Sequence, residues 1–248
     1  MIGIVLISHS RKLAEGVLDL AREMGGEDLN IIAVGGVGKN DDSLGTTATS
    51  IHDAIEKVFS NDGVLVLMDL GSAVINAEFA LEMMPKEKSK KVYLCGASLV
   101  EGAVAAAVQV RIGASLDKVF KEAQNSLAAK QIQLGVSELE INNDLPPTLS
   151  EIKENEETFF RLVINNPVGL HARPAARFVE KAGSFPKTNI FVTNITRKKG
   201  PVSGKSIIRL TALGVRQGDE IQVTAVGDNS NVALEDLRNL LETQINEK

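Results

Sequence analysis

IVLISHSRKLAEGVLDLAREM, residues 4–24, changes its hydrophobic period once. Its first four residues are all apolar, as in a strand that is buried on both faces of a sheet. After Ser8, His9 and Ser10, apolar side chains recur every three to four residues, which predicts an amphipathic helix. The expected buried face of this helix comprises Leu13, Val17, Leu20, Ala21 and Met24. A buried strand followed directly by such a helix predicts an α/β fold.

The same alternation continues to about residue 135. Short apolar runs predict four strands at 2–7, 30–34, 63–68 and 91–95. Further helices are expected at 51–59, 73–84, 101–110 and 115–131. Strands that alternate with helices predict a mostly parallel sheet with helices on both faces.

The pattern fails at residues 137–158, where two prolines interrupt a segment with seven acidic residues and one lysine. We therefore expect an acidic linker at 136–157, between a domain of residues 1–135 and a second domain of residues 158–248. The second domain is predicted to be small and α+β. Its expected strands lie at 159–164, 189–193 and 220–226, with a helix at 172–182 and another at the end of the chain.

Composition excludes several classes of function. A net charge of −5 gives no general basic character, so no nucleic-acid partner is expected. No apolar stretch is long enough to cross a bilayer, and residues 2–7 lack the positive flank of a secretory signal, so we expect a cytoplasmic protein without membrane insertion. Cys95, the only cysteine, is expected to be a buried strand thiol, and no metal or cofactor is predicted.

The chain has three histidines, His9, His52 and His171. His52 lies beside the apolar row of its predicted helix and is expected to be a solvated side chain without a role. Imidazole chemistry therefore belongs to His9 or His171.

NPVGLHARPAARFV, residues 166–179, is expected to place His171 at a helix N-terminus, because Pro174 is tolerated in a first turn. Free N–H groups and the positive end of the helix dipole favour a phosphoryl group there. Arg173 and Arg177 add cationic donors that match phosphate oxygens. A neutral imidazole nitrogen at this position can act as the nucleophile, although an isolated histidine of this kind is more often a solvated cap.

His9 ends the first predicted strand and Asp69 ends the third. In a parallel sheet both lie at the edge where ligands bind, so Asp69 can reach the imidazole and fix its tautomer. Gly71 and Ser72 open the next helix and are expected to bind phosphate, as is Thr46 in the loop after the second strand. The simpler alternative is a histidine hydrogen-bonded to a backbone carbonyl.

The motif GLHARPA, residues 169–175, resembles the active-site motif of the phosphocarrier protein HPr of the bacterial phosphotransferase system. The similarity spans about residues 157–248 and implies a βαββαβα sandwich. It also implies that His171 receives phosphate on Nδ1 from enzyme I, with Arg173 stabilising the phosphohistidine. Ser206 falls where some HPr proteins carry a regulatory serine, but capping a short helix is an equally good interpretation.

Residues 1–135 resemble the enzyme IIA domain of the mannose phosphotransferase family in three segments: residues 4–24, VLMDLGSAVINAE and GASLVEGAVAAAVQVRIGASL. They are more similar to the phosphotransfer subunits of phosphoenolpyruvate-dependent dihydroxyacetone kinases. This resemblance implies that His9 accepts phosphate on Nε2, that Asp69 supports it, and that the domain forms a homodimer. The apolar segment Ala103–Val110 is a plausible shared surface.

These resemblances predict a phosphotransferase subunit that carries phosphate from enzyme I to His171, then to His9, and finally to ADP. The ADP is expected on a separate kinase subunit, with a further subunit binding dihydroxyacetone. The alternatives are a component of mannose-type sugar uptake and a regulatory phosphocarrier acting on transcription factors. Longer relatives carry an enzyme-I-like portion, so enzyme I is expected to be a separate protein. A P-loop is excluded because Ala33 and Asn40 occupy two of its required positions.

Overall fold

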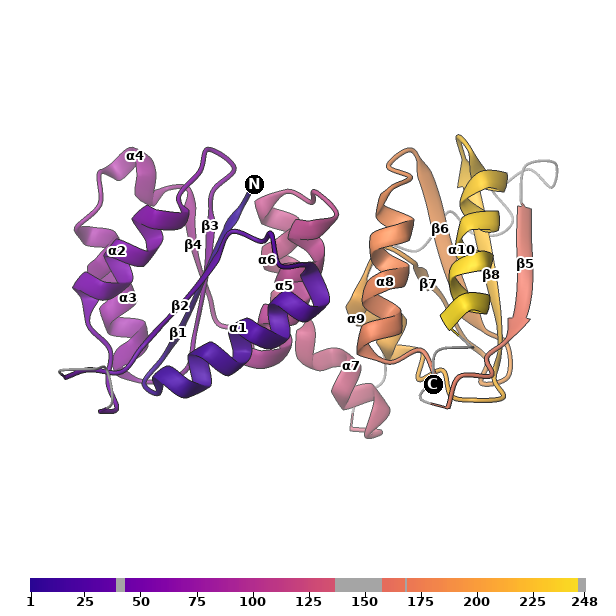
Figure 1. Cartoon of the computed structure of the whole chain (residues 1–248), viewed down its shortest axis with the longest axis horizontal. Helices are drawn as coiled ribbons and strands as arrows, with labels where there is room; N and C mark the ends of the chain where they lie inside the picture. The colour runs from indigo at the N-terminus through magenta and orange to yellow at the C-terminus, as the bar shows by residue number, and fades with distance from the viewer. Residues whose placement is uncertain (39–42, 137–157, 168, 245–248) are drawn as a thin grey trace. The chain divides into compact units, whose positions relative to one another are not determined.

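The computed structural model describes residues 1–38, 43–136, 158–167 and 169–244 (Figure 1). The chain divides into two compact units, Met1–Leu127 and Ala128–Lys248. Residues 137–157 of the predicted linker lie outside the described residues, so the predicted domain limits stay predictions. No helix in the described part of the chain is long and apolar enough to span a membrane.

The first unit is built on a four-stranded parallel sheet in the order β2-β1-β3-β4. The strands are β1 (Gly3–Ser8), β2 (Ile31–Gly35), β3 (Val64–Met68) and β4 (Val92–Cys95). All four predicted strands are therefore confirmed to within one residue at each end. Cys95 is fully buried at the end of β4, and burial raises the pKa of its thiol, as expected for an inert cysteine.

Helices cover both faces of this sheet, which confirms the predicted architecture (Figure 1). One face carries α1 (Arg11–Gly25), α5 (Leu99–Arg111) and α6 (Leu116–Gln124). The other carries α2 (Ala48–Val58) and α3 (Ser72–Glu82), and the short α4 (Lys86–Ser89) precedes β4. The strands supply both cores because successive side chains point to opposite faces.

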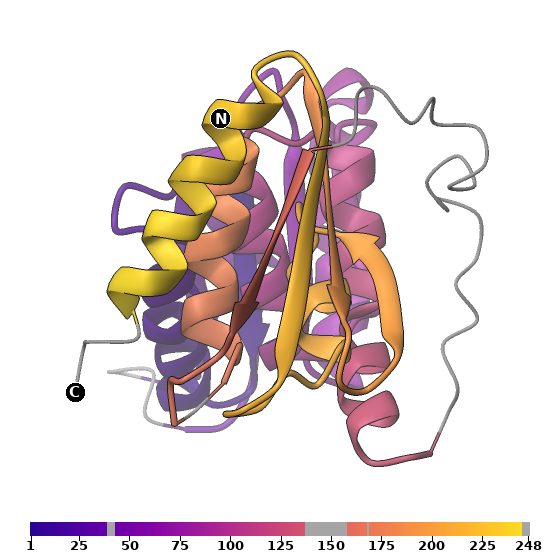
Figure 2. The same cartoon turned by 90° about the vertical axis from the view of Figure 1, so that its right-hand side faces the viewer.

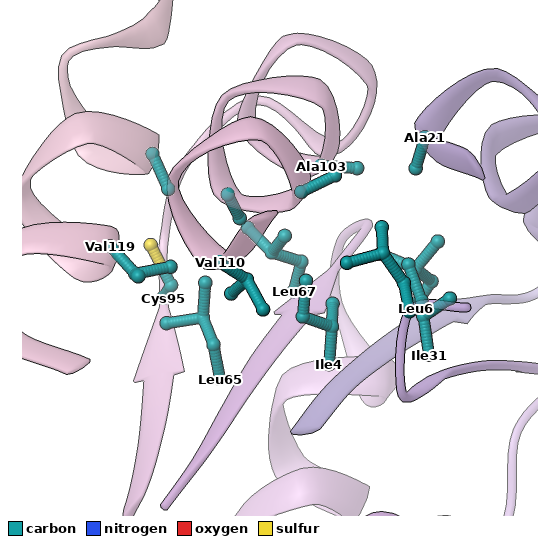
Figure 3. Packing of buried hydrophobic residues seen from close by; sticks show 14 of the residues in the cluster. Ile4, Leu6, Ala21, Ile31, Leu65, Leu67, Cys95, Ala103, Val110 and Val119 are labelled. Carbon is teal, nitrogen blue, oxygen red and sulfur yellow. The ribbon is translucent and has the colours of Figure 1, made fainter. Parts of the chain in front are cut away.

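Small residues bring α1 and α5 close to the sheet and to each other (Figure 3). Ala103, Ala106, Ala107 and Val110 pack against β-strand side chains such as Leu67. The prediction that Ala103–Val110 forms a dimer surface is therefore wrong, because these four side chains lie inside the unit itself.

The predicted buried face of α1 is partly wrong. Leu13 is exposed, whereas Ala14, Val17 and Ala21 are buried. The close approach of α1 to α5 explains the difference, because a Cβ added at Gly25 would lie only 2.9 Å from Ala107. Small residues fill this contact, and the larger Leu13 faces outward.

The helix expected at 115–131 is two helices, α6 and α7 (Ser126–Gln133). Asn125 lies at the break, and its side-chain amide donates to the carbonyl oxygen of Lys121 at 2.9 Å. An asparagine side chain that bonds the backbone in this way competes with regular helix hydrogen bonding.

The second unit has the element order β5 (Thr158–Val163), α8 (Ala172–Gly183), β6 (Thr188–Asn194), β7 (Lys199–Ser203), α9 (Ile207–Ala212), β8 (Glu220–Gly227) and α10 (Ser230–Gln244). Its antiparallel sheet has the order β5-β8-β6-β7, and α8 and α10 pack together on one face (Figure 2). The predicted βαββαβα sandwich is confirmed. Along β8, Ile221, Val223 and Ala225 are buried in alternation with partly exposed residues, as expected for a sheet with one covered face.

Candidate functional site

His9 is held by its own backbone where β1 ends. Its carbonyl oxygen accepts the N–H groups of Gly36 at 3.2 Å and Gly45 at 2.9 Å. Two residues later α1 begins, and the Ser10 hydroxyl caps it by accepting the N–H of Leu13 at 3.3 Å. The histidine is thus fixed between a strand end and a helix start.

Asp69 follows β3, the parallel neighbour of β1, and the structure brings it to His9 as expected. Oδ1 accepts the ring Nδ1–H of His9 at 2.9 Å and the N–H of Leu70 at 2.8 Å. Oδ2 accepts the backbone N–H of His9 at 2.8 Å and the hydroxyl of Ser8 at 2.9 Å. All four groups donate to the carboxylate, so Nδ1 carries the ring proton and Nε2 keeps its lone pair.

Two opposing effects act on the Asp69 carboxyl. Partial burial by itself raises its pKa, because it disfavours the charged form. The hydrogen bonds from His9, Ser8 and Leu70 outweigh burial, and the pKa is lowered overall. Asp69 is therefore an anion at neutral pH, ready to balance positive charge on the imidazole.

Ser72 lies on the other side of the ring. Its hydroxyl is 2.8 Å from Nε2 of His9 and donates to that nitrogen, because Nδ1 holds the proton. Ser72 is the first residue of α3, and Gly71 precedes it with φ of +59°, a conformation that other residues rarely adopt. The N–H groups of Ala73 and Val74 donate to the carbonyl oxygens of Leu70 and Gly71 at 3.3 and 3.1 Å, so the donor that the start of α3 places beside Nε2 is the Ser72 hydroxyl. The His9 side chain is 28% exposed, so the ring is partly open to solvent.

Thr46 lies in the loop that Gly45 ties to His9. The amide of Asn76 donates to its carbonyl oxygen at 3.0 Å and to its hydroxyl oxygen at 2.8 Å. Asn76 is one turn after Ser72, so Thr46 is attached to the same helix that presents Ser72. Residues 39–42 of this loop lie outside the described residues.

His52 belongs to α2, and its Nδ1 lies 3.3 Å from the carboxylate of Asp53. Its side chain is 23% exposed, so it is more covered than the solvated side chain predicted.

His171 is the N-cap residue of α8, as predicted, and its side chain is exposed. Its carbonyl oxygen accepts the N–H of Ala175 at 2.8 Å, and Pro174 lies in the first turn. Among the described residues, none donates a capping hydrogen bond to the ring. The ring therefore projects from the start of a helix, where the dipole favours an anion.

Arg173 and Arg177 lie on the first two turns of α8, four residues apart, with exposed side chains. Side chains at this spacing share one side of a helix. Both side chains therefore extend from the same side of α8, the helix that His171 precedes.

Ser206 is the N-cap residue of α9, and its hydroxyl oxygen accepts the N–H of Arg209 at 3.2 Å. The capping interpretation is therefore confirmed, and the residue is nearly fully buried. A regulatory role for Ser206 stays a prediction.

The sequence prediction did not include Ser8 and Asn76. Ser8 is the fully buried polar end of β1 and donates to Asp69, whereas Asn76 holds the Thr46 loop. A serine at the end of an otherwise apolar strand is the signal that identifies Ser8. Asn76 has a weaker signal, its four-residue spacing from Ser72.

In comparison with known proteins, the two units of the chain match two different family models. Residues 3–120 match the family model described as the fructose IIA component of the phosphotransferase system, and residues 160–243 match that of the HPr component phosphorylation site. The phosphoryl donor subunit DhaM of the PEP-dependent dihydroxyacetone kinase of Escherichia coli is 39% identical over 251 residues, which cover all of this chain and 51% of that protein. The corresponding subunit of Providencia stuartii is 36% identical and covers 94% of this chain and 48% of that protein.

The chain thus spans about half the length of these two relatives. A shorter relative is matched almost completely. The phosphoryl donor subunit DhaM of dihydroxyacetone kinase 2 from Listeria innocua is 41% identical over 125 residues, half of this chain and 98% of that protein. Together with the two family models, this match shows that the chain belongs to the family of phosphoryl donor subunits of PEP-dependent dihydroxyacetone kinases.

Proposed function

We propose that the chain is a phosphohistidine relay. Phosphate passes from phosphoenolpyruvate through enzyme I to His171, then to His9, and then to ADP on a kinase subunit that phosphorylates dihydroxyacetone. The observation that carries this proposal is the line of hydrogen bonds from Asp69 through the His9 ring to Ser72, because it leaves Nε2 as an oriented nucleophile.

The transfer step uses the His9 ring as the structure holds it. The Nε2 lone pair attacks the phosphorus carried by His171, and a new P–N bond forms while the old one breaks. The released electron pair returns to the His171 nitrogen, which the family resemblance identifies as Nδ1. No proton leaves His9, because Nδ1–H stays bonded to Asp69 while the ring acquires positive charge.

The surroundings of Nε2 suit the phosphorylated state. The Asp69 carboxylate faces the ring and stabilises the charge that develops on it. The Ser72 hydroxyl is positioned to donate to a phosphoryl oxygen, and it lies at the start of α3, where the helix dipole favours an anion. We assign Gly71 and Thr46 supporting places in this site, since Gly71 sets the turn and Thr46 is bonded to α3 through Asn76.

At His171 the corresponding contributions come from the α8 N-terminus and from Arg173 and Arg177. A phosphoryl group on an exposed ring is accessible to a donor and to an acceptor in turn. This exposure suits a carrier that meets enzyme I first and His9 second.

The names of the relatives favour dihydroxyacetone phosphorylation over sugar uptake or transcriptional regulation. Reconstitution tests this choice. The chain is incubated with phosphoenolpyruvate, enzyme I and the ADP-binding and dihydroxyacetone-binding kinase subunits, and triose phosphate is measured. Formation of triose phosphate that depends on both histidines is the expected result. If both histidines are labelled but no triose phosphate forms, the result would support the relay and contradict its proposed final acceptor.

We also propose that the first unit forms a homodimer, and we place the interface on α3. This helix is apolar around most of its circumference, which is typical of a helix covered on all sides. Its buried face is Ala73, Ala77 and Ala80, whereas its other face and the residues that flank the helix expose five large apolar side chains. These are Leu70, Val74, Ile75, Phe79 and Met83. An exposed apolar area of this kind indicates a contact surface.

Sedimentation of the full chain tests the dimer. The wild type is expected to be a dimer at micromolar concentration, and Phe79→Glu to be a folded monomer, because a charge in an apolar interface is costly. Leu13→Glu is the control, since Leu13 on α1 is an apolar side chain of similar exposure, 47% against 51% for Phe79. A monomeric wild type would contradict the dimer, and a dimeric Phe79→Glu would contradict the α3 interface.

A further inference from the structure

Asp219, immediately before β8, bonds two other segments of the second unit, the turn 194–197 after β6 and the loop at Arg216. Its Oδ2 accepts Nε–H of Arg197 at 2.6 Å, the backbone N–H of Arg216 at 2.9 Å and the side-chain amide of Asn194 at 3.0 Å. The residue is only 4% exposed. Burial by itself raises the pKa of Asp219, but these hydrogen bonds and the Arg197 charge lower it overall, so the buried group is an anion.

The loop that Asp219 holds also carries the turn before His171. The carbonyl oxygen of Val215 accepts the N–H of Leu170 at 3.2 Å. Gly169 has φ of +66° and lies so close that an added Cβ would be 2.2 Å from the same oxygen. The place of the His171 backbone in the fold is therefore set by the position of Val215.

A second contact fixes the beginning of the same turn. The N–H of Gly218 donates to the carbonyl oxygen of Ile164 at 2.7 Å, and the amide of Gln217 donates to the carbonyl oxygen of Asn165 at 3.1 Å. Residues 215–218 thus bond the segment 164–170 at both of its ends. Asp219 is next to this loop and accepts the N–H of Arg216 within it.

We propose that Asp219 is a positioning residue for phosphoryl transfer at His171, acting through the loop 215–218 and the Gly169–Leu170 turn. This inference rests on the proposed relay, since it concerns the rate at which His171 is phosphorylated. In this role Asp219 contacts neither the His171 ring nor the phosphoryl group on it. It holds the backbone that aims the ring, and attack by a nucleophile is sensitive to displacements of about 1 Å.

The test compares two substitutions at Asp219 with the same changes at Asp228. Asp219→Asn keeps an oxygen acceptor and removes the charge. Asp219→Ala removes the acceptor as well, so the Arg216 N–H and the Asn194 amide lose the oxygen to which they donate. Asp228 lies at the opposite end of β8 with an exposed side chain, so Asp228→Asn and Asp228→Ala are matched controls. Full-length variants receive labelled phosphate from phosphoenolpyruvate and enzyme I, and kcat and KM are measured for labelling of His171.

Asp219→Ala is expected to lower kcat about tenfold with KM nearly unchanged, because the ring is misaligned while the surface of α8 is retained. Asp219→Asn should have a smaller effect, about threefold, because neutral hydrogen bonds are about half as strong as charge-assisted ones. Hydrogen exchange of the Leu170 amide supplies a readout that does not need enzyme I. It should accelerate in both Asp219 variants and not in the controls, while the amides of β8 keep their wild-type rates.

Three outcomes would overturn the proposal: a kcat equal to that of the controls, a loss confined to KM, or a slower reaction with unchanged exchange at Leu170. If Asp219→Ala does not fold, the same criteria apply to Asp219→Asn. A wild-type chain that enzyme I does not label would instead refute the relay, and Leu170 exchange would still report whether Asp219 fixes the turn.

Discussion

The two histidines proposed to carry phosphate both stand where a helix begins, but the protein orients them in different ways. The His9 ring is held directly, by the Asp69 carboxylate on one nitrogen and the Ser72 hydroxyl on the other. Within the described residues, the exposed His171 ring has no capping hydrogen bond and is positioned through its backbone, which follows a turn bonded to the loop 215–218. Direct bonds fix a tautomer, whereas backbone bonds fix a position and leave the ring free to rotate toward one protein and then another.

This contrast assigns the two sites to different steps. A carrier that meets two partners benefits from an exposed ring, and a final donor benefits from a single oriented nucleophile. The largest predicted effect is therefore on the order of transfer. His171→Ala should take no label from phosphoenolpyruvate and enzyme I, whereas His9→Ala should take label only on the second domain. Proteolysis followed by mass spectrometry locates the label.

His52→Ala is the control and should label as the wild type does, because in the part of the chain described the His52 ring hydrogen-bonds only to Asp53. Transfer between two imidazoles exchanges one P–N bond for another and should be reversible. Separately added HPr domain should therefore restore label at His9 in His171→Ala. Direct labelling of His9 by enzyme I, with no phosphocarrier present, would reverse the proposed order.

The next effect comes from the direct bond to His9. In Asp69→Asn one of the two acceptor oxygens becomes an NH₂ group, although each oxygen now accepts two donors. If this group faces Nδ1, the ring proton moves to Nε2 and the nucleophilic lone pair is lost. We expect transfer through His9 to slow about 10²-fold or more, as when an aspartate that orients a catalytic histidine is changed to asparagine. Labelling of His171 should not change.

Asp53→Asn is the matched control, since it alters the other histidine–aspartate contact in the same unit. Rapid-quench measurement of transfer from His171 to His9 gives the rate, and circular dichroism verifies the fold. A folded Asp69→Asn with the wild-type rate would show that the carboxylate does not act on the ring.

Much of the first site could be predicted because each of its residues follows a strand that the sequence pattern locates. The apolar runs located the strands, and the C-terminal ends of the parallel strands β1 and β3 bring His9 and Asp69 together although 60 residues separate them. His171 was predictable for a similar reason, since glycine, proline and the apolar period define the start of α8.

The remaining features depend on tertiary packing. Leu13 is exposed because small residues fill the contact between α1 and α5, and hydrophobicity alone does not reveal which face of a helix fits closely. Asp219 gathers partners from positions 194, 197 and 216, and no sequence period links these residues. The apolar outer face of α3 was missed because an apolar helix is normally assumed to be fully buried.

A smaller effect is expected from the second direct contact of His9. Ser72→Ala removes one neutral hydrogen bond to Nε2 and one donor to the phosphoryl group. Because such a bond contributes about 1 kcal/mol, transfer through His9 should slow about fivefold. Ser89→Ala, which removes a serine hydroxyl bonded to the backbone of α4, is the control. A loss as large as that of Asp69→Asn would mean that Ser72 contributes as much as Asp69 to the state of the ring.

The smallest effect concerns acid stability, where the two units are alike. Asp69 in the first and Asp219 in the second each have a pKa below the ordinary value of 3.8. A folded-state pKa that is lower than the unfolded one contributes stability above about pH 4, and this contribution is lost as the pH falls through the folded pKa. Between about pH 5 and pH 3, the free energy of unfolding should therefore fall less steeply in Asp69→Asn and Asp219→Asn than in the wild type.

Each substitution should flatten only the transition of its own unit, because neither aspartate contacts the other unit in any hydrogen bond described above. Denaturant unfolding at several pH values, followed by NMR signals from each unit, measures the two slopes separately. Asp228→Asn, an exposed acid, should keep the wild-type slope. Equal slopes in Asp219→Asn and the wild type would mean that the Asp219 carboxylate is not held more tightly in the folded state. His171 would then lack the anionic anchor that His9 has in Asp69, and the two sites would differ even more than their geometry indicates.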